Sequence, residues 1–144
     1  MGAVIAEGKR KMSRKLKAKA WKLFSTYIRR KYADRDGMVS CVTCGVRKHW
    51  KDGIQAGHFI DSRNNSILFQ EDLTFPQCCS CNMFKKGNKV KYTLFMLKKY
   101  TKKQVEEMSN LKFKTKKITD DDYLELIDDL QDKLIGLDIR DGKL

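Results

Sequence analysis

A chain of 144 residues is long enough for one domain with a modest core, and its formal net charge of +13 is high for that size. No stretch is long and apolar enough to predict a membrane-spanning helix, and the first residues lack the apolar segment of a secretory signal. We therefore expect a cytoplasmic protein. Five cysteines in that reducing compartment indicate metal binding rather than disulfides.

The positive charge is concentrated in two segments. Residues 1–35 carry twelve Lys and Arg against two acids, and residues 84–117 carry the same numbers. Residues 36–83 are close to neutral, and the tail from Ile118 is acidic. A polyanion lying over the neutral centre would be held from both sides, which favours a nucleic-acid partner over a basic surface kept only for solubility.

The N-terminal third is predicted to contain a basic arm and one amphipathic helix. Residues 1–12 show no periodicity and are expected to be flexible, and Ser13 is placed to cap the helix that follows. The opposite face of this helix is basic. Apolar side chains recur at helical spacing at Leu16, Ala20, Phe24, Tyr27 and Ile28.

Two strands are predicted before the middle of the chain. Residues 38–42 form the first, and residues 54–60 are expected to pair with them as a hairpin with a long loop. Gly45 closes the first Cys-x-x-Cys motif, where positive φ lets both sulfurs turn to one point.

The cysteine spacing is the strongest chemical signal. Cys41 and Cys44 form one pair, and Cys78 and Cys81 form the other. Four thiolates close a tetrahedral zinc site and leave no open position, so this zinc is expected to be structural. Cys79 does not fit the spacing and is expected to be a buried bystander.

His58 and Asn82 are the candidate catalytic residues. His58 lies between two complete cysteine pairs, so zinc does not need it, and it could act as a general base toward water. Asn82 opens a short helix after the last cysteine, and its amide oxygen suits a hard cation such as Mg²⁺ or Mn²⁺. The zinc is expected to fix the hairpin carrying His58 against the turn carrying Asn82. The alternative is a zinc-knuckle DNA- or RNA-binding module without catalysis, which explains the cysteines and the charge equally well.

Three helices are predicted after Gly87. Apolar spacing predicts one over residues 90–100, and a capping box of Thr101 and Gln104 opens a second. Thr119 opens an acidic last helix, which could pack on the basic segments or mediate self-association.

The motifs CVTCG, AGHF, QCCSCN and KKGN resemble those of the lambdoid phage NinG (Rap) recombination nucleases, and more broadly the HNH, or His-Me finger, endonucleases. The resemblance covers residues 21–100 and, more loosely, the C-terminal helices. It implies a DNA endonuclease acting on branched recombination intermediates (Holliday junctions, forks or flaps) in the host cytoplasm. The resemblance also implies that His58 is the general base and that Asn82 is a ligand of the catalytic metal.

The fold implied is α+β, with a zinc-stabilised ββα-metal core flanked by an N-terminal basic helix and C-terminal helices. We expect a basic arm over residues 1–12, the nuclease core with its N-terminal helix over 13–100, and a helical extension over 101–144. A homodimer, joined through the last helix, would place two active sites on the two strands of a junction.

Two positions depart from the HNH pattern. Many of these nucleases have a metal-binding aspartate just before the histidine, where this chain has Gly57, so Asp61 or Asp72 must complete the metal shell. The asparagine that orients the base would fall near Leu73, whose side chain cannot accept a hydrogen bond. A backbone carbonyl or Asp72 is expected to replace it.

Basic side chains beside the site are expected to hold DNA phosphates without reading sequence, and binding should therefore weaken steeply as salt rises. These side chains are Lys85, Lys86, Lys89, Lys91 and Arg63.

Overall fold

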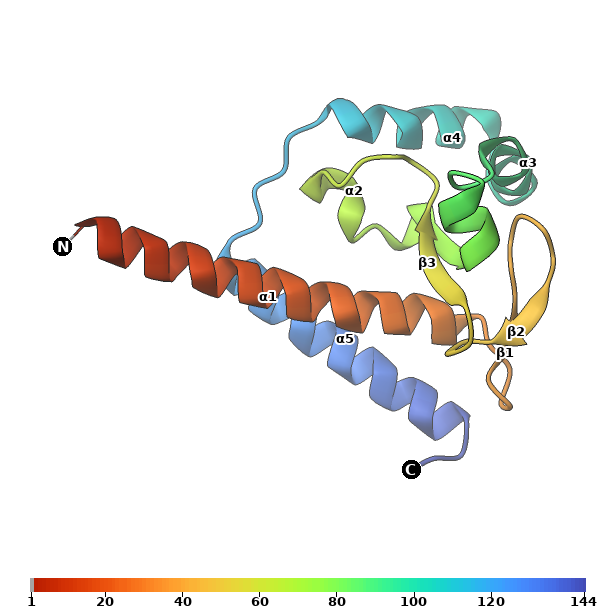
Figure 1. Ribbon diagram of the computed structural model, residues 1–144, viewed down its shortest axis with the longest axis horizontal. Coiled ribbons are helices and arrows are strands. Elements are labelled where there is room, and N and C mark those ends of the chain that lie inside the picture. The colour runs from red at the N-terminus through yellow and green to blue at the C-terminus, as the bar shows by residue number, and fades with distance from the viewer. Residues whose placement is uncertain (1) are drawn as a thin grey trace.

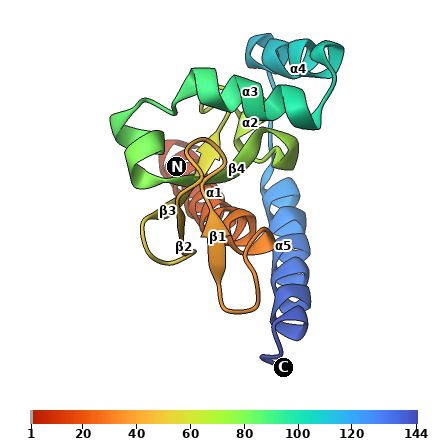
Figure 2. The ribbon, with the colours of Figure 1, turned by 90° about the vertical axis from the view of Figure 1, so that its right-hand side faces the viewer.

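The computed structural model describes residues 2–144 and has the predicted α+β class, with helices predominating (Figure 1). Helix α1 (Gly2–Lys31) runs along the longest axis, and helix α5 (Asp120–Arg140) packs beside it. Helices α3 (Lys89–Lys99) and α4 (Lys102–Ser109) lie above the strands in Figure 2, whereas α5 runs down their right-hand side. None of the helices described combines the length and apolar character needed to cross a membrane.

The strands form two small antiparallel sheets of two strands each. Strand β1 (Met38–Ser40) pairs with β2 (Arg47–His49), and β3 (Ile54–His58) pairs with β4 (Thr74–Cys78). The predicted pairing of residues 38–42 with 54–60 is therefore wrong. The turn after β1 reverses the chain at once, so β1 pairs with the adjacent β2 and leaves β3 to pair with the fully buried β4.

Helix α1 is longer than the sequence predicted. It begins at Gly2, so the expected cap at Ser13 is wrong: Ser13 lies inside the helix, and its hydroxyl donates to Asp120 Oδ1 at 2.6 Å. Residues 2–12, expected to be a flexible arm, are helical and exposed throughout, and Met1 lies outside the described residues. No face of this stretch is buried, so nothing imposes an apolar period on its sequence.

The predicted apolar stripe of α1 packs against α5. The acidic helix therefore packs on a basic segment, which was one of the two roles considered for it. Buried side chains of α1 meet those of α5, and the Arg30 guanidinium donates to Asp138 at 2.8 Å and to Asp141 at 3.3 Å. Thr119 caps α5 in the predicted capping box. The buried side chains of the interface are Ala20, Phe24, Tyr27 and Ile28 of α1, and Tyr123, Ile127 and Leu130 of α5.

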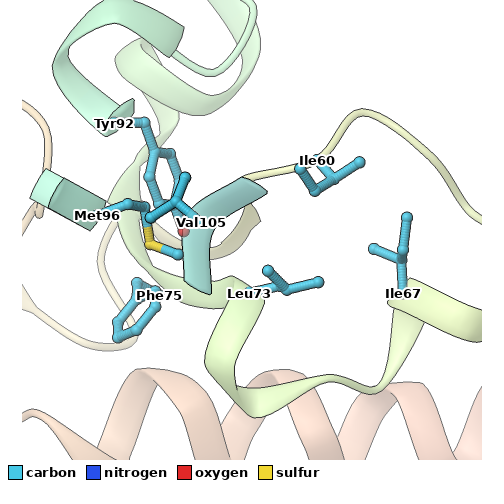
Figure 3. Close-up of a cluster of buried hydrophobic side chains, with 7 residues drawn as sticks. All are labelled: Ile60, Ile67, Leu73, Phe75, Tyr92, Met96 and Val105. Atoms are coloured by element: carbon cyan, nitrogen blue, oxygen red, sulfur yellow. The ribbon is translucent and has the colours of Figure 1, made fainter. Parts of the chain in front are cut away.

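A second core joins β4 to the C-terminal helices. The Tyr92 hydroxyl crosses from α3 and donates to the Gly57 carbonyl at 2.6 Å, which fixes α3 on β3. The predicted capping box of Thr101 and Gln104 is present at the start of α4. Figure 3 shows the buried side chains of this core: Ile60, Ile67, Leu73, Phe75, Tyr92, Met96 and Val105.

Four short helical turns complete the chain. They are α2 (Asn65–Leu68), the 3₁₀ turns η1 (Glu71–Leu73) and η3 (Asn110–Phe113), and the π-helical turn η2 (Ser80–Phe84).

Candidate metal centre and candidate active site

The structure brings together the four cysteines predicted to bind zinc. The sulfur atoms of Cys41, Cys44, Cys78 and Cys81 all lie within 4.8 Å of one another, and those of Cys44 and Cys78 are 3.7 Å apart. A tetrahedral site with zinc–sulfur bonds of about 2.3 Å requires sulfurs about 3.8 Å apart. The cluster can therefore hold a structural zinc.

Local turns place these sulfurs. Cys41 follows β1, and the Gly45 amide, at φ +80°, donates to the Cys41 carbonyl at 2.9 Å and closes the first turn. Cys78 ends β4, and Cys81 lies in η2. The metal centre thus fixes the β1–β2 hairpin onto the end of β4. The cluster also joins the β3–β4 hairpin, through Cys78, to the η2 turn of Asn82, through Cys81; His58 itself pairs with Thr74 at the opposite end of β4.

Hydrogen bonds favour the thiolate at two of the four cysteines, Cys41 and Cys81, whereas burial raises the pKa of Cys44 and of Cys78. Burial alone would raise the pKa of Cys41, but hydrogen bonds from the Thr43 hydroxyl and from nearby backbone amides lower that pKa to about 6. Asn88 donates its amide to the Cys81 sulfur at 3.5 Å. Such contacts favour the thiolate, which is the form that binds zinc.

Cys79 stands outside the cluster, as its spacing predicted. It is half-buried rather than buried, because it faces the exposed side of η2, where its sulfur contacts Met83 Sδ at 3.6 Å.

His58 ends β3 with its imidazole fixed from two sides. Nε2 lies 3.0 Å from the Leu68 carbonyl oxygen, and the ring stacks on Trp21 at 5.3 Å between centroids. A carbonyl only accepts, so Nε2 carries the proton and Nδ1 keeps its lone pair. The expectation that a backbone carbonyl orients this histidine is met by Leu68, whereas Leu73 is buried in the core.

The electrostatic surroundings keep His58 neutral. Burial lowers its pKa below the ordinary 6.5, and the positive charges of Arg63 and Lys89 act in the same direction. The hydrogen bond to Leu68 and the charge of Asp61 oppose the shift. A neutral imidazole with a free lone pair is suited to accept a proton at neutral pH.

A hollow of about 450 Å³ joins several predicted site residues. Its lining includes His58, Asn82, Asp61 and Arg63, which come from β3, η2 and the loop after β3. Asp72 does not line it: its carboxylate accepts from the Tyr100 hydroxyl at 3.3 Å and borders a separate hollow. Of the two acids considered for the metal shell, only Asp61 lies with His58 and Asn82.

Gln55 orients Asn82, a contact that the sequence analysis did not find. The Asn82 amide nitrogen donates to Gln55 Oε1 at 2.7 Å, so its Oδ1 is left available to a cation. Gln55 occupies an outward position of β3, where a polar residue is unremarkable, and the sequence held no signal for this contact.

Packing explains why glycine precedes the histidine. A Cβ at Gly57 would lie 2.0 Å from Gln77 Oε1, so the position has no room for the aspartate of the HNH pattern. Gln77 is fully buried and donates to the Gly87 carbonyl at 2.9 Å and to Thr43 Oγ1 at 3.2 Å. Gly57 therefore faces the interior rather than the hollow.

The predicted DNA-binding side chains differ in their surroundings. Lys89 is half-buried, and its ammonium lies 2.9 Å from Asp61 Oδ1 and donates to the carbonyls of His58 and Phe59. Arg63 lies over the Trp21 ring at 5.8 Å and lines the hollow. The remaining three, Lys85, Lys86 and Lys91, are exposed.

The fold and the cysteines define a small α+β protein with a four-cysteine cluster that can hold a metal ion. A family model described as Bacteriophage Lambda NinG protein matches residues 5–139. The chain belongs to this NinG family. Searches of the curated proteins and of the solved structures found no match for it.

Proposed function

We propose that this NinG-family protein is a metal-dependent DNA endonuclease that hydrolyses phosphodiester bonds of branched recombination intermediates. The observation that carries the proposal is the common hollow of His58 and Asn82. His58 lies on the first strand of the β3–β4 hairpin, and Asn82 lies on the helical turn that follows it. This order supports a ββα-metal, or His-Me finger, core. The preference for branched DNA rests on the resemblance to the NinG nucleases.

His58 is the proposed general base. Nδ1 would take a proton from the attacking water, while Nε2–H keeps its bond to the Leu68 carbonyl. The charge that forms on the ring is then shared with a fixed acceptor, and stacking on Trp21 prevents the ring from turning. Such a base contributes roughly 10²- to 10⁴-fold to a rate.

Oxygen atoms beside His58 suit a hard cation. The Asn82 Oδ1 and the Asp61 carboxylate are hard ligands, and Asp61 keeps one oxygen free while the other meets Lys89. Mg²⁺ or Mn²⁺ bound there would stabilise charge on the scissile phosphate and on the leaving 3′-oxygen. Arg63, at the same hollow, would hold a neighbouring phosphate.

The test is the metal requirement for cleavage. Wild-type protein and Asn82→Ala are incubated with branched and linear DNA in Mg²⁺, in Mn²⁺ and in EDTA. We expect wild-type cleavage of branched DNA in Mg²⁺ or Mn²⁺ alone, and a loss of at least roughly tenfold for Asn82→Ala. Absence of cleavage by the wild type under every condition, with DNA binding retained, would favour the zinc-knuckle binding module instead.

A further inference from the structure

Two large apolar side chains are exposed immediately after Asn82. Phe84 has 82% of its surface exposed and Met83 has 59%, whereas Cys81 in the same turn is buried in the metal centre. Figure 2 shows this bright-green segment at the edge of the molecule, ahead of α3. A single exposed apolar residue needs no explanation, but an adjacent pair beside a candidate active site indicates a contact surface.

The segment is held rigidly although its tip is exposed. Asn82 is bonded to Gln55, and Met83 Sδ lies 3.4 Å from the Gln55 amide nitrogen. The Gly87 amide donates to the Cys81 carbonyl at 2.8 Å, which closes the turn beyond Phe84. The backbone that carries Phe84 is therefore held beside Asn82, so only the phenylalanine side chain must be ordered when it binds.

Left-handed backbone marks the end of the same turn. Lys86, Gly87 and Asn88 have successive φ values of +49°, +87° and +49°. Glycine adopts this conformation freely and asparagine tolerates it, so the backbone strain falls on Lys86, two residues after Phe84.

The charge around Phe84 selects the partner. Residues 83–105 contain eight lysines and no acid, and the exposed Lys85 and Lys86 directly follow the phenylalanine. A partner must therefore offer negative charge beside an apolar face. Nucleic acid with an unpaired base does so, because the face of a base inside a continuous duplex is covered by its neighbours.

We infer that Phe84 stacks on an unpaired base next to the scissile phosphate, and that this contact favours branched over continuous duplex DNA. The inference rests on the proposed function for its choice of DNA. The Cα atoms of Asn82 and Phe84 are at most about 7.6 Å apart, two virtual bonds along the chain, so the base is a near neighbour of the cation site. Stacking on an aromatic ring is tolerant of sequence, so no base preference is expected.

The inference is tested by DNA binding of the zinc-loaded protein without added Mg²⁺ or Mn²⁺, where cleavage does not interfere and the structural zinc is not removed. One DNA carries a single-stranded flap with 2-aminopurine at the branch, and the other is a continuous duplex of the same sequence. Phe84→Ala should bind the flap roughly 5- to 150-fold more weakly, the range for one base–aromatic stack, and the duplex with unchanged affinity. Phe84→Trp should restore flap binding.

Phe113 provides a matched control. It is 76% exposed at the end of the short helix η3, and the Lys112 ammonium lies 5.0 Å from its ring, but it lies outside the η2 turn that carries Asn82 and Phe84. Phe113→Ala should bind both DNAs as the wild type does. Wild-type protein and Phe113→Ala should quench the 2-aminopurine fluorescence, and Phe84→Ala should not.

An unchanged affinity of Phe84→Ala for the flap would overturn the inference. So would an equal loss for flap and duplex, or an equal loss in Phe113→Ala, since these results would describe a general apolar contact. Phe84 is exposed, so its replacement should leave the urea midpoint unchanged. Selective flap binding through Phe84 without any cleavage in Mg²⁺ would refute the nuclease proposal and leave this inference standing.

Discussion

Replacing Gly57 by alanine should destabilise the fold even though only one methyl group is added. The new Cβ would lie 2.0 Å from Gln77 Oε1 and 2.8 Å from Gln77 Cδ, far inside van der Waals contact. Gln77 cannot move away freely, because it is fully buried and its amide nitrogen donates to the Gly87 carbonyl and to Thr43. The clash must be relieved by shifting the strands or by breaking those hydrogen bonds.

The expected loss of stability is the cost of shifting the strands together with the cost of the broken hydrogen bonds of Gln77. Overpacking a core costs about 1–3 kcal/mol, and each lost hydrogen bond adds about 0.5–1.5 kcal/mol. We expect Gly57→Ala to lower the free energy of unfolding by about 2–5 kcal/mol, a large share of the roughly 5–15 kcal/mol of a typical domain. Urea denaturation of the zinc-loaded protein measures this loss.

A double-mutant cycle with Gln77→Ala identifies the cause. Gln77→Ala alone is destabilising, since it empties a buried site. The double variant should be more stable than the sum of the single losses predicts, by about 1–3 kcal/mol, because the clash disappears with the glutamine side chain. A neutral Gly57→Ala, or losses that simply add, would refute the reasoning that Gln77 dictates glycine before the histidine.

Three further predictions concern the metals and the base. Cys41→Ser should lose zinc and unfold at lower urea, whereas Cys79→Ser should keep one zinc per chain by elemental analysis; zinc loss from the Cys79 variant would show that the wrong cysteine was assigned. Burial lowers the pKa of His58, and His58 must be neutral to act as the base. The cleavage rate should therefore rise with pH through a pKa below 6.5 and be level above it. A rate that still rises above pH 7.5 would exclude His58 as the base. Asp61→Asn should raise the Mn²⁺ concentration needed for half-maximal cleavage at least roughly tenfold, and Asp72→Asn should not. An increase in Asp72→Asn but not in Asp61→Asn would identify Asp72 as the ligand of the catalytic cation.

Local sequence patterns predicted those parts of the fold whose causes are local. The capping boxes at Thr101 and Thr119 pair side chains three residues apart, and both are present. The apolar stripe of α1 and the helices α3 to α5 were likewise predicted from the spacing of residues that are close together in the sequence. The start of α1 was missed because the residues before Ser13 are helical without a buried face, which leaves no periodic signal.

Strand pairing could not be predicted from the sequence, because it depends on contacts between distant residues. Residues 47–49 are polar and exposed in part, so β2 has no alternation to mark it. The same short turn that brings Cys41 to Cys44 also returns the chain onto β1. Strand β3 then pairs with the buried β4 across the intervening loop. The spacing of apolar residues predicts that a strand is buried but does not identify its partner strand.

The part of the candidate site that was predictable is the part in which the spacing of the residues along the chain is typical of metal ligands. Two Cys-x-x-Cys pairs have one common use, and the four sulfurs meet as expected. The two contacts that hold His58 were not predictable: no spacing marks Trp21 as its stacking partner, and the Leu68 carbonyl belongs to the backbone and carries no side-chain signal. The choice between Asp61 and Asp72 likewise depended on which loop reaches the hollow.

The most direct test of the central claim is the cleavage rate of His58→Ala under single-turnover conditions, with a labelled branched DNA and Mn²⁺. The matched control is His49→Ala, which removes the other histidine of the chain and does not touch the hollow. Removal of the general base should slow cleavage by at least roughly 10²-fold while DNA affinity and zinc content stay at wild-type values, and His49→Ala should cleave normally. Full activity in His58→Ala, or equal losses in the two variants, would contradict the assignment of this hollow as a nuclease active site.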